Sequence, residues 1–119
     1  MYSYRLVDKD ENPEDAALRE LQEETGFIGK LSECQFDIPY YSDPWKSNEQ
    51  QRLFIVEIDV DEMANKSPHQ QLEEDESIST VIVPISKLSE FIRSEESKGI
   101  IVSTSIFFVA SIMSNSFSL

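Results

Sequence analysis

The sequence predicts a single small domain of mixed α/β or α+β architecture, and three observations support this prediction. A chain of 119 residues is long enough for one compact domain but short for two. Hydrophobic residues make up 39% of the chain, which is enough to form a core. Helical and strand-like patterns follow one another in the order helix, strands, helix, helix. This order favours a sandwich of helices on a sheet over residues 1–119.

The first helix is expected from Asn12 to Gly26. Asn12 is a favourable N-cap, and Pro13 suits the first helical position because an N–H there would have no partner within the helix. Gly26 is typical of the residue that ends a helix, since glycine adopts the left-handed conformation without steric cost. The apolar face of this helix is expected to contain Ala17, Leu18, Leu21 and Thr25.

Three later segments have the β-branched and aromatic composition of strands. They are residues 34–41, which Pro39 interrupts, residues 52–60 and residues 79–85. A long polar loop, residues 61–76, lies between the last two and ends in the acidic cluster Glu73–Glu76. We expect the first helix to face this acidic loop.

Two further helices are expected towards the C-terminus. Residues 85–99 predict a short helix that Gly99 ends. Residues 100–113 form the most apolar segment, and their length is more typical of a helix than of a strand. The segment is shorter than the roughly 20 residues that a bilayer-spanning helix needs. A buried element is therefore favoured over a membrane anchor.

The composition excludes several classes of function. The formal net charge is −13, which argues against electrostatic binding to nucleic acid or to an anionic membrane. Cys34 is the only cysteine, so an intramolecular disulfide is excluded. We expect Cys34 to be a small buried hydrophobic residue.

No secretory signal precedes the first helix, so the expected location is the cytoplasm or the nucleus.

Carboxylates are concentrated on one face of the first helix. Glu20 and Glu24 are four residues apart, and Glu23 lies at the edge of the same face. These side chains repel one another, and Arg19 is the only cation inside the helix. A row of carboxylate oxygens suits Mg²⁺, which in turn recruits phosphate oxygens. The alternative for such a pattern alone is a solvated acidic helix face.

The spacing of these residues resembles the Nudix box, G-x5-E-x7-R-E-U-x-E-E-x-G-U, in which U is a bulky apolar residue. Chance would produce the eight matches at roughly one in 10⁸ starting positions. One position departs from the pattern, because Arg5 stands where the box opens with glycine. The matching residues are Glu11, Arg19, Glu20, Leu21, Glu23, Glu24, Gly26 and Phe27.

The resemblance implies a role for each residue of the box. Glu20 and Glu24 correspond to the principal ligands of the divalent metal, Mg²⁺ or Mn²⁺, and Glu23 assists them and takes part in catalysis. Arg19 corresponds to the arginine that orients the glutamates of the box through salt bridges. Gly26 corresponds to the glycine that turns the chain out of the helix.

Further resemblance is to the ADP-ribose and ADP-sugar diphosphatase branch, whose products from ADP-ribose are AMP and ribose 5-phosphate. Pro44 falls on the proline of a loop that follows the box, and Trp45 is a candidate for stacking on the substrate. A surface or packing role for Trp45 is the favoured alternative. Glu76 falls on the catalytic glutamate of a later loop and is the candidate for orienting or deprotonating the attacking water. The alternative is that residues 73–76 form only a solvated acidic loop. Ser79 stands where many members carry a second glutamate.

The family resemblance also implies an α/β/α sandwich with a mixed sheet, which we expect to be incomplete at the N-terminus. The box begins close to Met1, whereas several strands precede it in the family. In the ADP-sugar branch, the segments before the box swap between the two subunits of a dimer, and the resemblance therefore implies a homodimer.

Besides a nucleotide-sugar hydrolase, two alternatives stay open. One is a catalytically impaired Nudix remnant that binds metal or a partner, and the other is an acidic interaction module.

Overall fold

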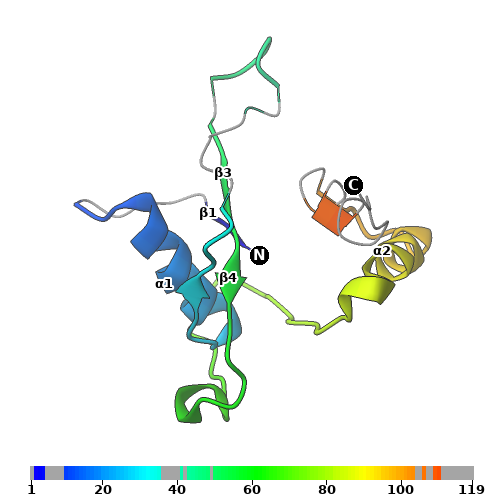
Figure 1. Cartoon of the computed structure of the whole chain (residues 1–119). Coiled ribbons are helices and arrows are strands. Elements are labelled where there is room, and N and C mark those ends of the chain that lie inside the picture. The colour runs from blue at the N-terminus through cyan, green and yellow to red at the C-terminus, as the bar shows by residue number, and fades with distance from the viewer. Residues whose placement is uncertain are drawn as a thin grey trace. The chain divides into compact units, whose positions relative to one another are not determined.

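The computed structural model describes residues 2–4 by their backbone, and residues 10–35, 41, 43–48, 50–103, 106 and 109–110 in full (Figure 1). The chain divides into two compact units, Met1–Ser79 and Thr80–Leu119, and each is described by itself. The first unit contains the predicted helix and the strand pairs. The second contains the later helix. The prediction that residues 1–119 form one domain stays a prediction.

Helix α1, Pro13–Thr25, forms where its local signals predict. The Asn12 side chain accepts a hydrogen bond from the Asp15 backbone N–H at 2.8 Å, and so satisfies one N–H at the start of the helix. Gly26 ends the helix with φ 81°, and its N–H donates to the Gln22 carbonyl. The buried face of α1 consists of Ala16, Ala17 and Leu21.

The strands of the first unit are short and pair antiparallel. Strand β1, Tyr2–Tyr4, pairs with β3, Arg52–Phe54, and β2, Lys30–Leu31, pairs with β4, Val56–Glu57. In Figure 1, α1 lies alongside these strands. The sequence did not predict β1. The predicted α+β class is confirmed, but the described strands form two antiparallel pairs rather than one mixed sheet.

The predicted strand over residues 52–60 ends at Glu57 and is interrupted at Ile55. There the Ile55 carbonyl accepts from the Ser32 N–H at 2.9 Å, and both backbone groups of Ile55 also bond to the side-chain amide of Gln35. Its Nε2 donates to the Ile55 carbonyl at 2.7 Å, and its Oε1 accepts from the Ile55 N–H at 3.0 Å. The predicted strand over residues 34–41 is not present at 34, 35 or 41, and its centre, 36–40, lies outside the described residues.

The core of the first unit lies between α1 and the strands, and Leu53, Phe54 and Val56 contribute to it from β3 and β4. The short 3-10 helix η1, Met63–Asn65, ends in the buried residue Asn65. Asn65 joins two distant segments, because it accepts from the Ile28 N–H and donates to the Ile28 and Asp59 carbonyls.

Cys34 is exposed, so the expectation that it is buried was wrong. It lies in a bend beside Gln35, outside the core.

The second unit contains the short 3-10 helix η2, Ile85–Lys87, and helix α2, Leu88–Ser97, which confirm the helix predicted over 85–99. The strand predicted over 79–85 was wrong. Residues 80–84 have no strand partner in the described part of the chain, and Val81 and Ile82 are exposed. A β-branched sequence forms a strand only where a neighbour supplies the hydrogen bonds.

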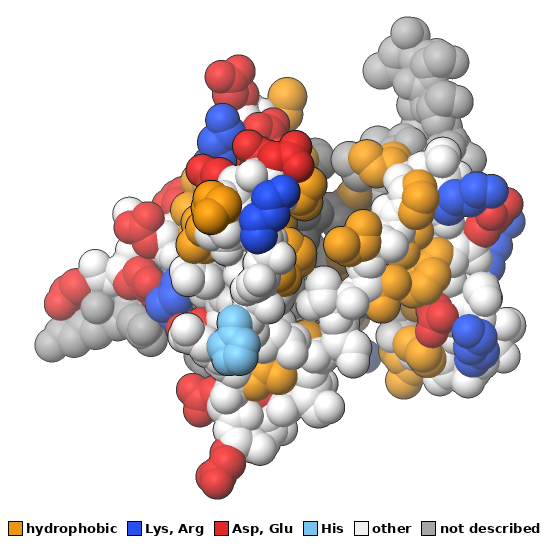
Figure 2. All heavy atoms as spheres, turned by 90° about the horizontal axis from the view of Figure 1, so that it is seen from below, with side chains coloured by type: hydrophobic (Ala, Val, Ile, Leu, Met, Phe, Trp, Pro, Cys, Tyr) orange, Lys and Arg blue, Asp and Glu red, His pale blue; other side chains and the backbone are white. Residues whose placement is uncertain are grey.

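The apolar C-terminal segment is helical at Ile106 and at 109–110, as far as it is described. Val109 and Ala110 are buried, as is Ile92 of α2. Within the described residues, no helix has both the length and the apolar character needed to cross a membrane. Other hydrophobic side chains lie at the surface among the charged ones, as one face of the molecule shows (Figure 2).

Candidate active site

The candidate site is built on a half-buried face of α1, where the helical spacing places Glu20, Glu23 and Glu24 on neighbouring turns. The side chains of Glu20 and Glu23 are 19% and 37% exposed. They are therefore partly desolvated, yet open to a ligand. The rigid helix, which both caps hold in place, sets the positions of all three carboxylates.

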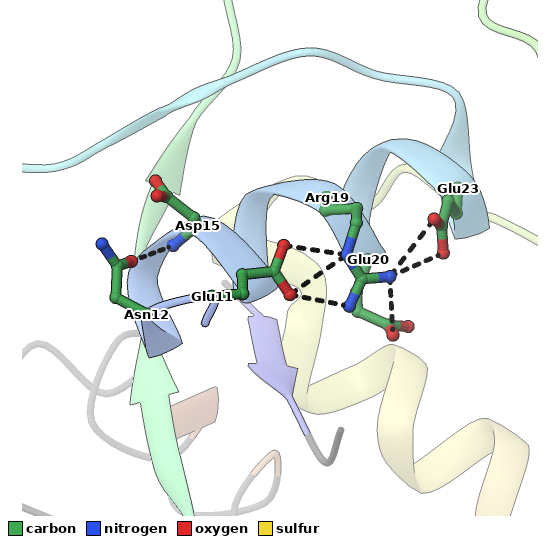
Figure 3. A network of polar contacts seen from close by, with 6 residues as sticks. All are labelled: Glu11, Asn12, Asp15, Arg19, Glu20 and Glu23. Carbon is green, nitrogen blue, oxygen red and sulfur yellow. Dashed lines mark hydrogen bonds and ion pairs between the residues drawn. The ribbon is translucent and has the colours of Figure 1, made fainter. Parts of the chain in front are cut away.

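Arg19 lies at the centre of a network of glutamates (Figure 3). Its Nε and Nη2 donate to the two oxygens of Glu11, at 3.0 and 3.1 Å. Its Nη1 donates to Glu20 at 3.3 Å and to Glu23 at 3.2 Å. The fork geometry of a guanidinium allows these contacts at once, which an ammonium group does not. The structure thus brings together Arg19, Glu20 and Glu23, as the sequence predicts.

Glu11 has a clear structural part in this network. It precedes the helix, yet its side chain is only 19% exposed and makes the two-pronged contact with Arg19. The sequence placed Glu11 in the box pattern without giving it a role. Its contact with Arg19 fixes the guanidinium on the side opposite Glu23, so that Nη1 faces the helix carboxylates.

The electrostatics of the cluster act most strongly on Glu20. Partial burial raises the pKa of Glu20 above its ordinary value of 4.5, and the negative charges of Glu24 and Glu23 raise it further. The Arg19 guanidinium opposes this rise. The negative charge on the helix is therefore only partly compensated by the protein itself. A cation would stabilise the ionised form of Glu20.

The donor set has the chemistry that a divalent cation requires, because Mg²⁺ and Mn²⁺ prefer carboxylate oxygens. In the conformation described, no three acidic, histidine or cysteine side chains of the described residues converge closely enough to hold one ion. Arg19 occupies oxygens of Glu20 and Glu23 instead. A bound cation would share these oxygens with Arg19 or displace it from them.

The loop that carries Glu76, residues 70–78, begins and ends beside the C-terminal end of α1. The Gln71 N–H donates to the Glu23 carbonyl at 2.7 Å, and Gly26 lies so close to the backbone of His69 that a Cβ would overlap it. The Glu76 carboxylate accepts a hydrogen bond from the Glu73 N–H at 3.0 Å. The expected approach of the acidic loop to the first helix is confirmed at this end, but the carboxylate itself bonds within its own loop.

Pro44 and Trp45 lie on a separate turn, in which the Asp43 carbonyl accepts from the Lys46 and Ser47 N–H groups. Trp45 is 75% exposed and lines a shallow depression with Tyr41. Among the described residues, no hydrogen bond joins Pro44 or Trp45 to the carboxylates of α1. The role of these two residues in substrate binding therefore stays a prediction.

Comparison with known proteins matches the NUDIX domain to residues 6–102, so this chain belongs to the NUDIX domain family. It is 38% identical to an uncharacterised Nudix hydrolase of Schizosaccharomyces pombe over 94 residues, which are 79% of this chain and 45% of that protein. It is 36% identical over 85 residues to an ADP-ribose pyrophosphatase of Saccharomyces cerevisiae, covering 71% of this chain and 36% of that protein.

A third relative is an ADP-sugar pyrophosphatase of Mus musculus, which is 34% identical over 79 residues. These residues are 66% of this chain and 35% of the mouse protein. The chain thus spans less than half the length of each of these three curated relatives. The family membership that the box predicts is confirmed, and the residues of the box lie inside the matched range.

Proposed function

We propose that this protein hydrolyses the pyrophosphate bond of ADP-ribose or a related ADP-sugar in the presence of Mg²⁺ or Mn²⁺, giving AMP and a sugar phosphate. One observation carries the proposal, which is the Arg19-centred carboxylate network on α1 in a chain of this family. The named activities of the yeast and mouse relatives support the substrate class. A second copy of the chain is proposed as a partner, in a homodimer.

In this proposal Glu20, Glu23 and Glu24 would hold the metal, which would supply positive charge to the pyrophosphate and make a water more acidic. Arg19 keeps the carboxylates of Glu20 and Glu23 turned towards one another before the substrate arrives. Glu76 leaves its hydrogen bond with the Glu73 N–H and accepts a proton from the attacking water on its carboxylate. The water oxygen then forms the new bond to phosphorus, while the bond to the bridging oxygen breaks.

Trp45 has a proposed part in holding the substrate. Its large exposed ring offers a face on which an adenine or a ribose can stack. Pro44, directly before it, fixes its own φ and so restricts the backbone of the turn that carries Trp45.

The test uses the full chain with ADP-ribose and Mg²⁺, and separates AMP from substrate by chromatography. We expect metal-dependent release of AMP and a loss of at least about 100-fold in Glu24→Gln, because one metal ligand is neutralised. Glu33→Gln is the matched control, since Glu33 is exposed and lies outside the network. Absence of AMP with both Mg²⁺ and Mn²⁺ would contradict the proposed activity of this polypeptide.

The second candidate is a module that binds metal or a partner without turnover. It is favoured by the hydrogen bond that the Glu76 carboxylate accepts from the Glu73 N–H, because this bond engages the candidate base within its own loop. Calorimetry distinguishes the two candidates. Heat of Mg²⁺ binding that Glu24→Gln abolishes, without release of AMP, supports the second candidate, whereas binding together with AMP release supports the first.

A further inference from the structure

The side-chain amide of Gln70 connects two backbone carbonyls that lie far apart in the sequence. Its Nε2 donates to the Glu24 carbonyl at 2.6 Å and to the Ile78 carbonyl at 2.8 Å. Glu24 is at the end of the helix that carries the candidate metal ligands, and Ile78 ends the loop that carries Glu76. Gln70 itself is half-buried. One side chain thus ties this loop to α1.

The chemistry of the amide fixes its orientation. A glutamine amide has two N–H donors on nitrogen, and its oxygen is an acceptor only. Because both partners of Gln70 are carbonyl oxygens, only the nitrogen can face them, and both of its hydrogens are used. A glutamate of almost the same shape would place a carboxylate against the two carbonyls, and so would lose both hydrogen bonds and add repulsion.

The contact is made at carbonyls that the helix itself leaves without a partner. The last carbonyls of an α-helix have no intrahelical N–H to accept. At the end of α1, the Gly26 N–H donates to the Gln22 carbonyl. The next two carbonyls accept from the loop: the Glu23 carbonyl from the Gln71 N–H, and the Glu24 carbonyl from the Gln70 side chain. The loop therefore completes the C-terminal cap of the helix, and its base is hydrogen-bonded to α1.

Between these two attachment points, the loop carries its own turn. The Glu73 N–H donates to the Glu76 carboxylate, and the Glu76 N–H donates to the Glu73 carbonyl, each at 3.0 Å. The position of Glu76 relative to α1 thus depends on how residues 70 and 78 are held. The other bond at the base, from Gln71 to Glu23, holds only the side at which the loop begins.

We propose that Gln70 is a positioning residue, which holds both ends of the Glu76 loop at fixed places beside the carboxylates of α1. Its consequence for catalysis rests on the function proposed above. Gln70 itself touches neither substrate nor metal in this proposal. It acts by limiting the distance between Glu76 and Glu24, so its loss would slow the chemical step and leave substrate binding unchanged.

The first test is amide hydrogen exchange of the full chain without metal or substrate. In Gln70→Ala, the amides of Gln71, Glu73 and Glu76 should exchange about 5- to 150-fold faster, because two hydrogen bonds that hold the loop are lost. Gln71→Ala is the matched control, since its backbone N–H rather than its side chain makes the contact. Amides in the middle of α1 should keep their rates in both variants, which verifies folding. Unchanged exchange at the three loop amides would overturn the inference.

The second test measures AMP release from ADP-ribose with Mg²⁺. We expect kcat to fall about 10- to 100-fold in Gln70→Ala, and at least as far in Gln70→Glu, with KM within about twofold of the wild type. Faster exchange with an unchanged kcat would overturn the positioning role. If the wild type releases no AMP, the proposed function fails, and hydrogen exchange still decides whether Gln70 holds the loop.

Discussion

Replacement of Arg19 by alanine is the perturbation whose effect on stability the structure defines best. The guanidinium bonds to Glu11, Glu20 and Glu23, and its side chain is 28% exposed. Removing it leaves three partly buried carboxylates that repel one another. A hydrogen bond to a charged group contributes about 1.5–3 kcal/mol when buried, whereas an exposed ion pair contributes about 0.2–1 kcal/mol.

Because this network is partly open to solvent, we expect an intermediate loss of about 1–2 kcal/mol in the free energy of unfolding. For a chain of this size, that loss lowers the Tm by about 4–8 °C. Arg19→Lys retains the positive charge but not the fork, so its loss should be about half as large. The measurement is thermal denaturation followed by circular dichroism, without metal and at low salt.

Arg93→Ala is the control, because Arg93 is an exposed arginine of α2. Its Tm should lie within about 1 °C of the wild type. A Tm for Arg19→Ala equal to that of the control would refute the reasoning, because it would mean that the network adds nothing to stability. High salt should reduce the difference between Arg19→Ala and the wild type, since salt screens charges that are near the surface.

Two further predictions concern single side chains of the first unit. Burial raises the pKa of Glu20 in the folded state, so the folded protein favours the protonated carboxyl. The stability that this protonation contributes is fully present below pH 4.5 and is lost as the pH rises through the folded-state pKa. Glu20→Gln should therefore leave the metal-free Tm nearly unchanged at pH 4 and raise it at pH 7, and a lower Tm at pH 7 would contradict this. Asn65→Leu should reduce the free energy of unfolding in urea by about 2–4 kcal/mol, because three backbone groups lose their buried partner, whereas the exposed Asn48→Ala should have little effect.

The parts of the fold that the sequence predicted correctly are those that local interactions determine. The bounds of α1 follow from Asn12 and Gly26, which act on residues within one turn of themselves. The strands were predicted less well, because a strand exists only where another segment pairs with it. Residues 79–85 have a strand composition without a strand partner in the described residues, and the Ile55 backbone bonds to the side chain of Gln35, 20 residues away.

The candidate site divides in the same way. The sequence by itself determined the carboxylate row of Glu20, Glu23 and Glu24, because a helix repeats every 3.6 residues and both ends of this helix are specified locally. Only the tertiary structure decided that Gln70 joins the Glu76 loop to α1. Its partner Glu24 is 46 residues away, and a contact over that distance depends on how the whole chain between them folds, which no local pattern encodes.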